Sequence, residues 1–148
     1  MGVIENDLNP SVYIGLKLPL EHGNQGFFGR TQKAIEQTKY NIKNLLLTKK
    51  GERLGNPTFG SDLEKVIFEQ EGDDLENRIE ETIRSSVSEW LPFVGIESIE
   101  TNFSANNRNA INVSIHFSLD IDSTQVEKLS MDFKSQEPKE YLFGSTIK

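Results

Sequence analysis

Residues 41–69, NIKNLLLTKKGERLGNPTFGSDLEKVIFE, contain the end of one helical pattern, a loop rich in glycine and proline, and the start of another helical pattern. Gly51 can adopt the left-handed conformation that closes a helix. Ser61 followed by Glu64 is a capping box, which indicates that a new helix begins there. The stretch contains no nucleophile elbow, metal-ligand cluster or phosphate-binding loop. We therefore interpret it as an element for packing and recognition.

Helical spacing of apolar residues extends from this stretch in both directions. Residues 31–48 form the first predicted helix, with Thr31 as its expected N-cap. A short helix follows Ser61 and is broken by Gly72, and a third helix, capped by Asp73 or Asp74, stops at Pro92. The residues expected on the buried faces of these helices are Ile35, Thr38, Ile42, Leu45, Leu46, Leu63, Val66, Ile67, Leu75, Ile79, Ile83, Val87 and Trp90.

Alternation of apolar and polar residues replaces the helical spacing in the last third of the chain. Residues 96–103 and 111–121 are predicted strands, joined by a turn at residues 106–109. A third strand is expected at residues 129–133. Helices followed by strands predict an α+β fold with an N-terminal extended arm, three helices, and a small antiparallel sheet of two or three strands. Such a small sheet has exposed strand edges, which other chains can extend.

The domain organisation follows from the same patterns. Residues 1–30 are expected to form an extended arm and a glycine-rich connector, in which Phe27 and Phe28 either anchor in a groove or cover the protein's own core. Residues 31–133 form the α+β domain. Residues 134–148 form a polar tail, whose apolar residues at 141–143 could dock on a surface.

Charge and composition exclude several classes of partner. The formal net charge is −7, which argues against nucleic acid as the main partner, because phosphate binding requires a basic face. The basic residues concentrate between Arg30 and Arg53 and the acidic ones between Glu69 and Glu81. This asymmetry suits docking on other proteins, and the alternative is two solvated helix faces of opposite charge. The chain has no cysteine. Its longest apolar run is three leucines, far short of the roughly 20 residues of a membrane span.

The titratable residues do not form a recognisable catalytic or metal-binding motif. His22 and His116 lie far apart in different predicted elements, and Asp120 with Asp122 is a weak match to a calcium loop. Glu52 and Asp62 flank the central loop, and they are the pair that a glycosidase would use. The alternative is that this is a chance pair of solvated acids, and that Asp62, like Glu64, serves the start of a helix. We expect no enzymatic activity, no cofactor and no metal.

The central stretch also carries a signature. Leu47-Thr48-x-x-Gly51-x-Arg53, then Pro57-x-Phe59-Gly60-x-x-Leu63, then Phe68, resembles the lysozyme-like tail baseplate family of contractile-tailed (T-even-like) phages, which is related to type VI secretion baseplate proteins. The resemblance implies a structural protein of the virion tail baseplate, made in the bacterial host cytoplasm and present in several copies of a symmetric assembly. Its expected partners are other baseplate wedge proteins and the tail sheath protein, whose assembly it would initiate. The alternatives are a peptidoglycan-degrading glycosidase, as the family label suggests, or the equivalent part of another contractile injection system.

The resemblance also assigns roles to residues. The family's Glu-Pro-Arg motif falls where this chain has Leu91-Pro92-Phe93, so the proline is present and both charges are absent. An apolar contact would replace the ion pair, or these side chains cover the protein's own core. The residues expected to contact the sheath by strand addition are Ile111, Val113, Ile115, Phe117, Leu119, Leu129, Met131 and Phe133. Those expected to contact the baseplate core are Arg53, Pro57, Phe59, Gly60, Leu91, Pro92 and Phe93.

Overall fold

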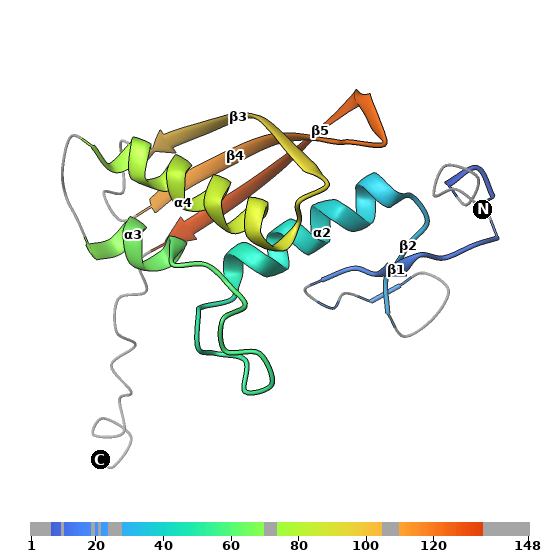
Figure 1. Ribbon diagram of the computed structural model, residues 1–148, viewed down its shortest axis with the longest axis horizontal. Helices are drawn as coiled ribbons and strands as arrows, with labels where there is room; N and C mark the ends of the chain where they lie inside the picture. The colour runs from blue at the N-terminus through green and yellow to red at the C-terminus, as the bar shows by residue number, and fades with distance from the viewer. Residues whose placement is uncertain are drawn as a thin grey trace, which may run out of the picture.

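A three-stranded antiparallel sheet carries helices on one face (Figure 1). The computed structural model describes residues 7–9, 11–18, 20, 22–23, 28–69, 74–104 and 110–134. The strands β3 (Val94–Phe103), β4 (Ala110–Leu119) and β5 (Asp122–Lys134) lie in the order β3-β4-β5, so β4 is central. The helices are α2 (Ala34–Leu47), α3 (Leu63–Glu69) and α4 (Leu75–Trp90). The predicted α+β class is confirmed.

The core lies between the helices and the sheet. Each helix turns one apolar stripe toward it, and β4 contributes every second residue, which is the pattern of a strand with one covered face. Ile42, Leu63 and Ile83 are completely buried. The remaining buried apolar residues are Leu45, Leu46, Ile67, Ile79, Val87, Val94, Ile111, Val113, Ile115, Phe117, Leu119, Leu129, Met131 and Phe133.

One helix starts at a different residue from the one predicted, and another starts as predicted without the expected capping bond. Helix α2 begins at Ala34, and Thr31 belongs to strand β2 (Arg30–Thr31), where its buried hydroxyl donates to Gln37 Oε1. The capping acceptor is instead Asp7 Oδ1, 2.8 Å from the Ala34 nitrogen. It comes from a segment 27 residues away, so local spacing could not reveal it. Helix α4 does begin after Asp74, but that carboxylate accepts from the Asn77 amide at 2.7 Å.

The predicted capping box at Ser61 forms only in part. Its backbone N–H donates to the Thr48 carbonyl at 2.9 Å, so it is not free for Glu64. The Glu64 carboxylate pairs with Lys49 Nζ at 3.1 Å instead. The Ser61 hydroxyl donates to the Leu46 carbonyl at 2.9 Å and accepts a longer bond from the Leu63 N–H at 3.4 Å. Ser61 therefore ties the end of α2 to the start of α3.

The strands are longer than the sequence indicates, and one ends earlier. Strand β3 starts at Val94, and β5 covers 13 residues rather than the five expected. Strand β4 ends at Leu119, because Asp120 and Ile121 form the turn into β5 and leave Ile121 half exposed. A bulge between Ile96 and Ser98 shifts the register of β3 against β4.

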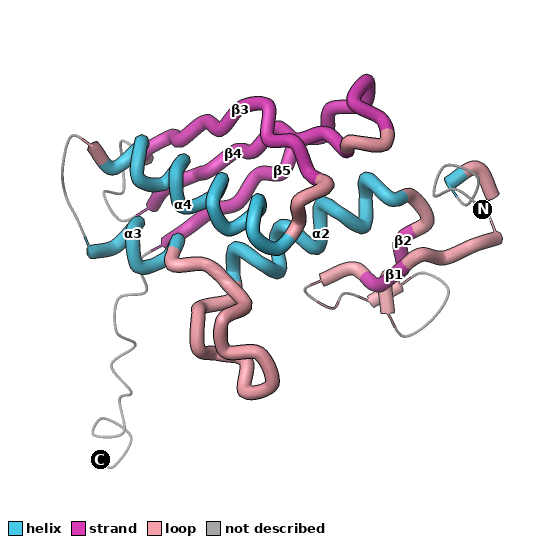
Figure 2. The backbone as a smooth tube through the Cα atoms, viewed as in Figure 1, coloured by secondary structure: helices cyan, strands magenta, loops and turns pink. Residues whose placement is uncertain are grey.

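The described part of the arm packs beside α2 rather than on the sheet (Figure 2). Strand β1 (Gly15–Leu16) pairs antiparallel with β2, and Lys17 Nζ lies 3.3 Å from a Glu36 carboxylate oxygen on α2. Ile14 and Leu16 in this extended arm are both about 40% exposed. The predictions for Phe27, Gly72, Asp73, residues 106–109 and residues 135–148 concern residues outside the described part of the chain.

Candidate functional site

The loop between α2 and α3 is closed at its base and braced inside. Lys49 and Ser61 form a parallel bridge at the base, and the Gly51 N–H donates to the Pro57 carbonyl at 2.7 Å across the loop. Within the loop, backbone bonds join Asn56 to Arg53 at 3.3 Å and Phe59 to Asn56 at 3.2 Å. Because these backbone groups bond to one another, the loop has a defined path.

Two glycines of the signature fit this path for different reasons. Gly51 has φ +89°, and a Cβ there would meet no atom within 4 Å. Gly60 has φ +125°, and a Cβ there would lie 2.5 Å from the Thr48 carbonyl oxygen. Gly51 is therefore required by backbone conformation, whereas Gly60 is required by conformation and by close approach of the α2 end.

Aromatic contacts connect the loop to the end of α4. The Phe59 ring packs edge-on against the Trp90 ring, with 5.2 Å between centroids, and it is partly buried against the core. The Arg53 guanidinium carbon lies 4.1 Å from the centroid of the Phe59 ring. The contacts from Arg53 to Phe59 and from Phe59 to Trp90 thus connect the loop to the turn after Trp90. These are the two segments expected from the sequence to contact the baseplate core.

In that turn, the three residues at the position of the Glu-Pro-Arg motif have different surroundings. Leu91 packs against the core, so the core-covering alternative holds for this residue. Pro92 is exposed, and Phe93 is 41% exposed. The Phe93 carbonyl accepts the Asp120 N–H at 3.1 Å, which fixes the turn to the end of the β4 strand. Phe93 and Pro92 are therefore available to a partner.

The acids around the loop have structural partners. Glu52 Oε2 accepts the Lys49 backbone N–H at 3.0 Å, and Asp62 Oδ2 lies 3.3 Å from Lys50 Nζ. Asp62 thus serves the start of α3, as expected in the alternative, and the structure adds that Glu52 stabilises the loop. Among the described residues, no group of three His, Cys, Asp or Glu could hold a metal ion. No helix of the described part is long and apolar enough to span a membrane.

The apolar residues assigned to sheath contact all point into the core. The five on β4 and the three on β5 are at most 7% exposed, so helices of the same chain cover these side chains. Strand β4 also has neighbours on both sides, so an added strand would have to join β3 or β5. The opposite face of the sheet is polar: Asn112 Nδ2 donates to Asp132 Oδ1 at 2.7 Å, and the Ser118 hydroxyl donates to Glu97 at 2.8 Å.

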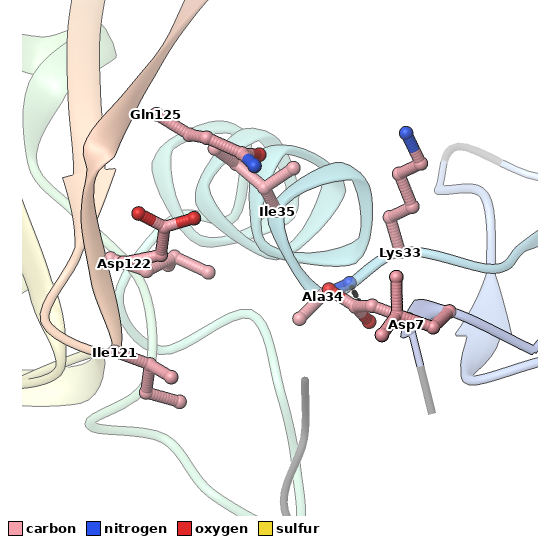
Figure 3. Close-up of a pocket in the computed structure, with 9 residues that line it drawn as sticks. Asp7, Lys33, Ala34, Ile35, Ile121, Asp122 and Gln125 are labelled. Carbon is pink, nitrogen blue, oxygen red and sulfur yellow. Dashed lines mark hydrogen bonds between the residues drawn. The ribbon is translucent and has the colours of Figure 1, made fainter. Parts of the chain in front are cut away.

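A small hollow of about 160 Å³ lies between the arm and the turn into β5 (Figure 3). Its polar groups are used locally: Asp7 caps Ala34, and Asp122 Oδ1 accepts from the Thr124 hydroxyl. The Lys33 side chain extends away from Ile121 and Asp122. The lining therefore offers no converging polar groups that would orient a small ligand.

Two functional candidates escaped the sequence reasoning. Leu54 is completely exposed at the tip of the loop, and only its position inside a glycine-rich segment could have singled it out. Trp90 was expected to be a core residue, but it is also the side chain on which the loop packs. Its Nε1 is buried and has no hydrogen-bond partner in the described part of the chain.

Comparisons with known proteins agree with this arrangement. In fold, the chain is similar to a protein named as a tail lysozyme from Geobacter sulfurreducens, with 20% identity, a TM-score of 0.63, and coverage of 72% of this chain and 95% of that one. It is also similar to a chain of the type VI secretion system baseplate complex, with 12% identity, a TM-score of 0.53, and coverage of 69% and 93%. A chain of the anti-feeding prophage baseplate gives 15% identity, a TM-score of 0.53, and coverage of 88% and 89%.

A search among curated proteins finds no match to the sequence. The model of one protein family, described as baseplate wedge protein gp25, matches residues 32–124, which is more than half of the chain. The match contains helices α2, α3 and α4, the loop between α2 and α3, and strands β3 and β4. This chain belongs to the gp25 family of baseplate wedge proteins, structural components of contractile injection systems.

Proposed function

We propose that this protein initiates assembly of the tail sheath on the baseplate wedge of a contractile phage tail, by adding a sheath strand to its sheet. The observation that carries the proposal is the strand order β3-β4-β5. In the described part of the chain, no strand pairs with the outer edge of β3 or β5, which contain 10 and 13 residues. Long edges of this kind present a row of backbone donors and acceptors to a second chain.

The eight buried residues of β4 and β5 support strand addition indirectly in this proposal. They pack β4 and β5 against the helices in one core, and thereby fix the position of the edge at which a sheath strand would pair. The Lys39–Glu127 ion pair, 3.1 Å long, adds a link between α2 and β5. Side chains on the polar face of the sheet would recognise the sheath protein.

The opposite attachment, to neighbouring proteins of the wedge, would use the loop and the turn after α4. Arg53, Pro57 and Phe59 lie in the loop, and Pro92 and Phe93 are exposed in the turn. The Phe59–Trp90 contact joins the two parts into one surface. We place this surface in the virion tail baseplate, in several copies, after synthesis in the bacterial host cytoplasm.

Deletion of the gene tests the proposal directly. Electron microscopy of the resulting particles is expected to show tails without sheath, with baseplates either finished or arrested at the wedge stage. Intact contractile tails with only an infection defect would contradict the proposal. Because two similar structures belong to a type VI secretion system and an anti-feeding prophage, the neighbouring genes should also be inspected. Capsid genes beside this one would support the phage tail, and toxin genes without capsid genes would contradict it.

Replacing Arg53 by alanine is expected to lower incorporation into the wedge about tenfold. The side chain is exposed, so the free energy of unfolding should change by no more than about 1 kcal/mol, the worth of an exposed cation–π contact. Mass spectrometry can measure the number of copies per purified baseplate, and urea unfolding can measure the stability. Normal incorporation of Arg53→Ala would show that Arg53 is only a solvated loop residue.

The purified protein is expected to give no clearing zone on a peptidoglycan gel, because Glu52 and Asp62 serve the loop as hydrogen-bond and ion-pair partners. Matched Glu52→Gln and Asp62→Asn variants are the controls. A clearing zone in the wild-type protein that disappears in either variant would contradict a purely structural role.

A further inference from the structure

The tip of the loop between α2 and α3 extends into solvent (Figure 2). Leu54 is 100% exposed there, and a Cβ added to its neighbour Gly55 would meet no atom within 4 Å. A single exposed leucine is common on protein surfaces. Leu54 differs because the segment that carries it is held in shape and has an orienting charge beside it.

The shape of the tip is fixed before any partner binds. The Gly51 N–H to Pro57 carbonyl bond of 2.7 Å spans the loop on both sides of Leu54. The Asn56 N–H to Arg53 carbonyl bond closes the turn that contains Leu54, and the Phe59 N–H to Asn56 carbonyl bond follows it. A loop that is already ordered loses less conformational entropy on binding, so it can dock with a small contact area.

The orienting charge is Arg53. Its guanidinium is held over the Phe59 ring, and Phe59 is held by Trp90. The nearby lysines have acidic partners, with Lys49 on Glu64 and Lys50 on Asp62, whereas the described residues provide no ion pair for Arg53. A guanidinium in this position can still donate its fork of N–H groups to an external carboxylate.

We propose that Leu54 and Arg53 together anchor this protein to a neighbouring baseplate protein. Leu54 enters an apolar pocket of that partner, and Arg53 pairs with a carboxylate at the rim of the pocket. The inference rests on the proposed function and names the chemistry of the wedge contact. Burial of one leucine side chain is worth roughly a tenfold to hundredfold gain in affinity.

The first test compares two identical changes, Leu54→Asp and Leu8→Asp, because Leu8 is also highly exposed but lies in the arm. An affinity-tagged full-length chain is purified from phage-infected cells, and the other baseplate proteins that accompany it are quantified by mass spectrometry. Leu54→Asp should lower their amount at least tenfold, while Leu8→Asp and Leu54→Met should stay within threefold of wild type. Thermal unfolding midpoints should not differ, because both leucines are exposed.

Equal losses from Leu54→Asp and Leu8→Asp, or no loss from Leu54→Asp, would overturn the anchor and leave the proposed function standing. Failure of the wild-type chain to purify with any baseplate protein would overturn the proposed function itself. A photo-crosslinking residue, p-benzoylphenylalanine, at position 54 identifies the partner surface. The expected product is a peptide of another baseplate protein with apolar residues and an Asp or Glu. A crosslink only to residues 135–148 of this chain would overturn the anchor.

Discussion

Replacing Gly60 by alanine is expected to destabilise the protein by about 2 to 5 kcal/mol, which is a large part of the stability of a typical domain. The new methyl group would lie 2.5 Å from the Thr48 carbonyl oxygen and 3.0 Å from the Lys49 carbonyl carbon. Both are backbone atoms at the end of α2, so neither can move without disturbing the bond between Ser61 and Thr48. The φ of +125° adds conformational strain. Urea unfolding, followed through the fluorescence of Trp90, measures the effect.

Alanine at two other glycines of the same loop separates the effect of positive φ from the effect of the close approach to α2. Gly51→Ala should cost about 1 to 2 kcal/mol, because its φ is positive but its surroundings are open. Gly55→Ala has neither problem and should leave stability unchanged or raise it by up to about 1 kcal/mol through the unfolded state. If Gly60→Ala lowers the free energy of unfolding by no more than Gly51→Ala does, the close approach between Gly60 and the end of α2 does not limit stability.

The sequence predicts most elements of this fold because apolar periodicity records which side of each element is covered. The stripe through Thr38, Ile42 and Leu46 appears on the buried side of α2 as expected. Thr38 is tolerated there because its hydroxyl donates to the Ala34 carbonyl at 2.9 Å within the helix. Alternation on β4 likewise predicts its buried apolar residues, whereas Ser114 and Ser118 on the opposite face are buried as well, against that expectation. In each case the signal lies within one element, where neighbouring positions in the sequence are neighbours in space.

The errors concern contacts between distant segments. Thr31 has the composition of an N-cap, but Asp7 occupies that place because β1 and β2 bring the arm beside α2. Glu64 has the spacing of a capping box, but Lys49 and the Thr48 carbonyl compete for its intended bonds. A capping residue that comes from elsewhere in the chain leaves no periodic trace in the sequence.

The candidate site also depends on features of the folded chain that local sequence patterns do not record. Gly51, Gly60 and Phe59 of the signature each have a geometric reason for their identity. Nothing in the signature marks Leu54, because complete exposure depends on the path of the loop and not on the residue type. The alternation in β4 shows that one face is covered, but it cannot show whether helices of the same chain or another protein cover it.

Replacing Phe117 by alanine tests whether helices of the same chain or another protein cover the apolar face of β4. Phe117 is completely buried on the central strand, so the variant should lose about 3 to 5 kcal/mol of unfolding free energy. The matched control is Phe103→Ala on β3, because Phe103 is 49% exposed and its removal should change stability by only about 0.5 kcal/mol. Urea unfolding of both variants, with the midpoint and slope compared, measures the difference.

The same two variants test what the buried residues do in assembly. If Phe117 acts only through the core, tail sheath should form at low temperature, where the variant is still folded, and should fail as the variant unfolds. If Phe117 contacted the sheath directly, sheath formation would be lost at every temperature while the unfolding curve stayed close to wild type. The helices that cover Phe117 favour the first result, and they leave the outer edges of β3 and β5 as the places where a sheath strand would pair.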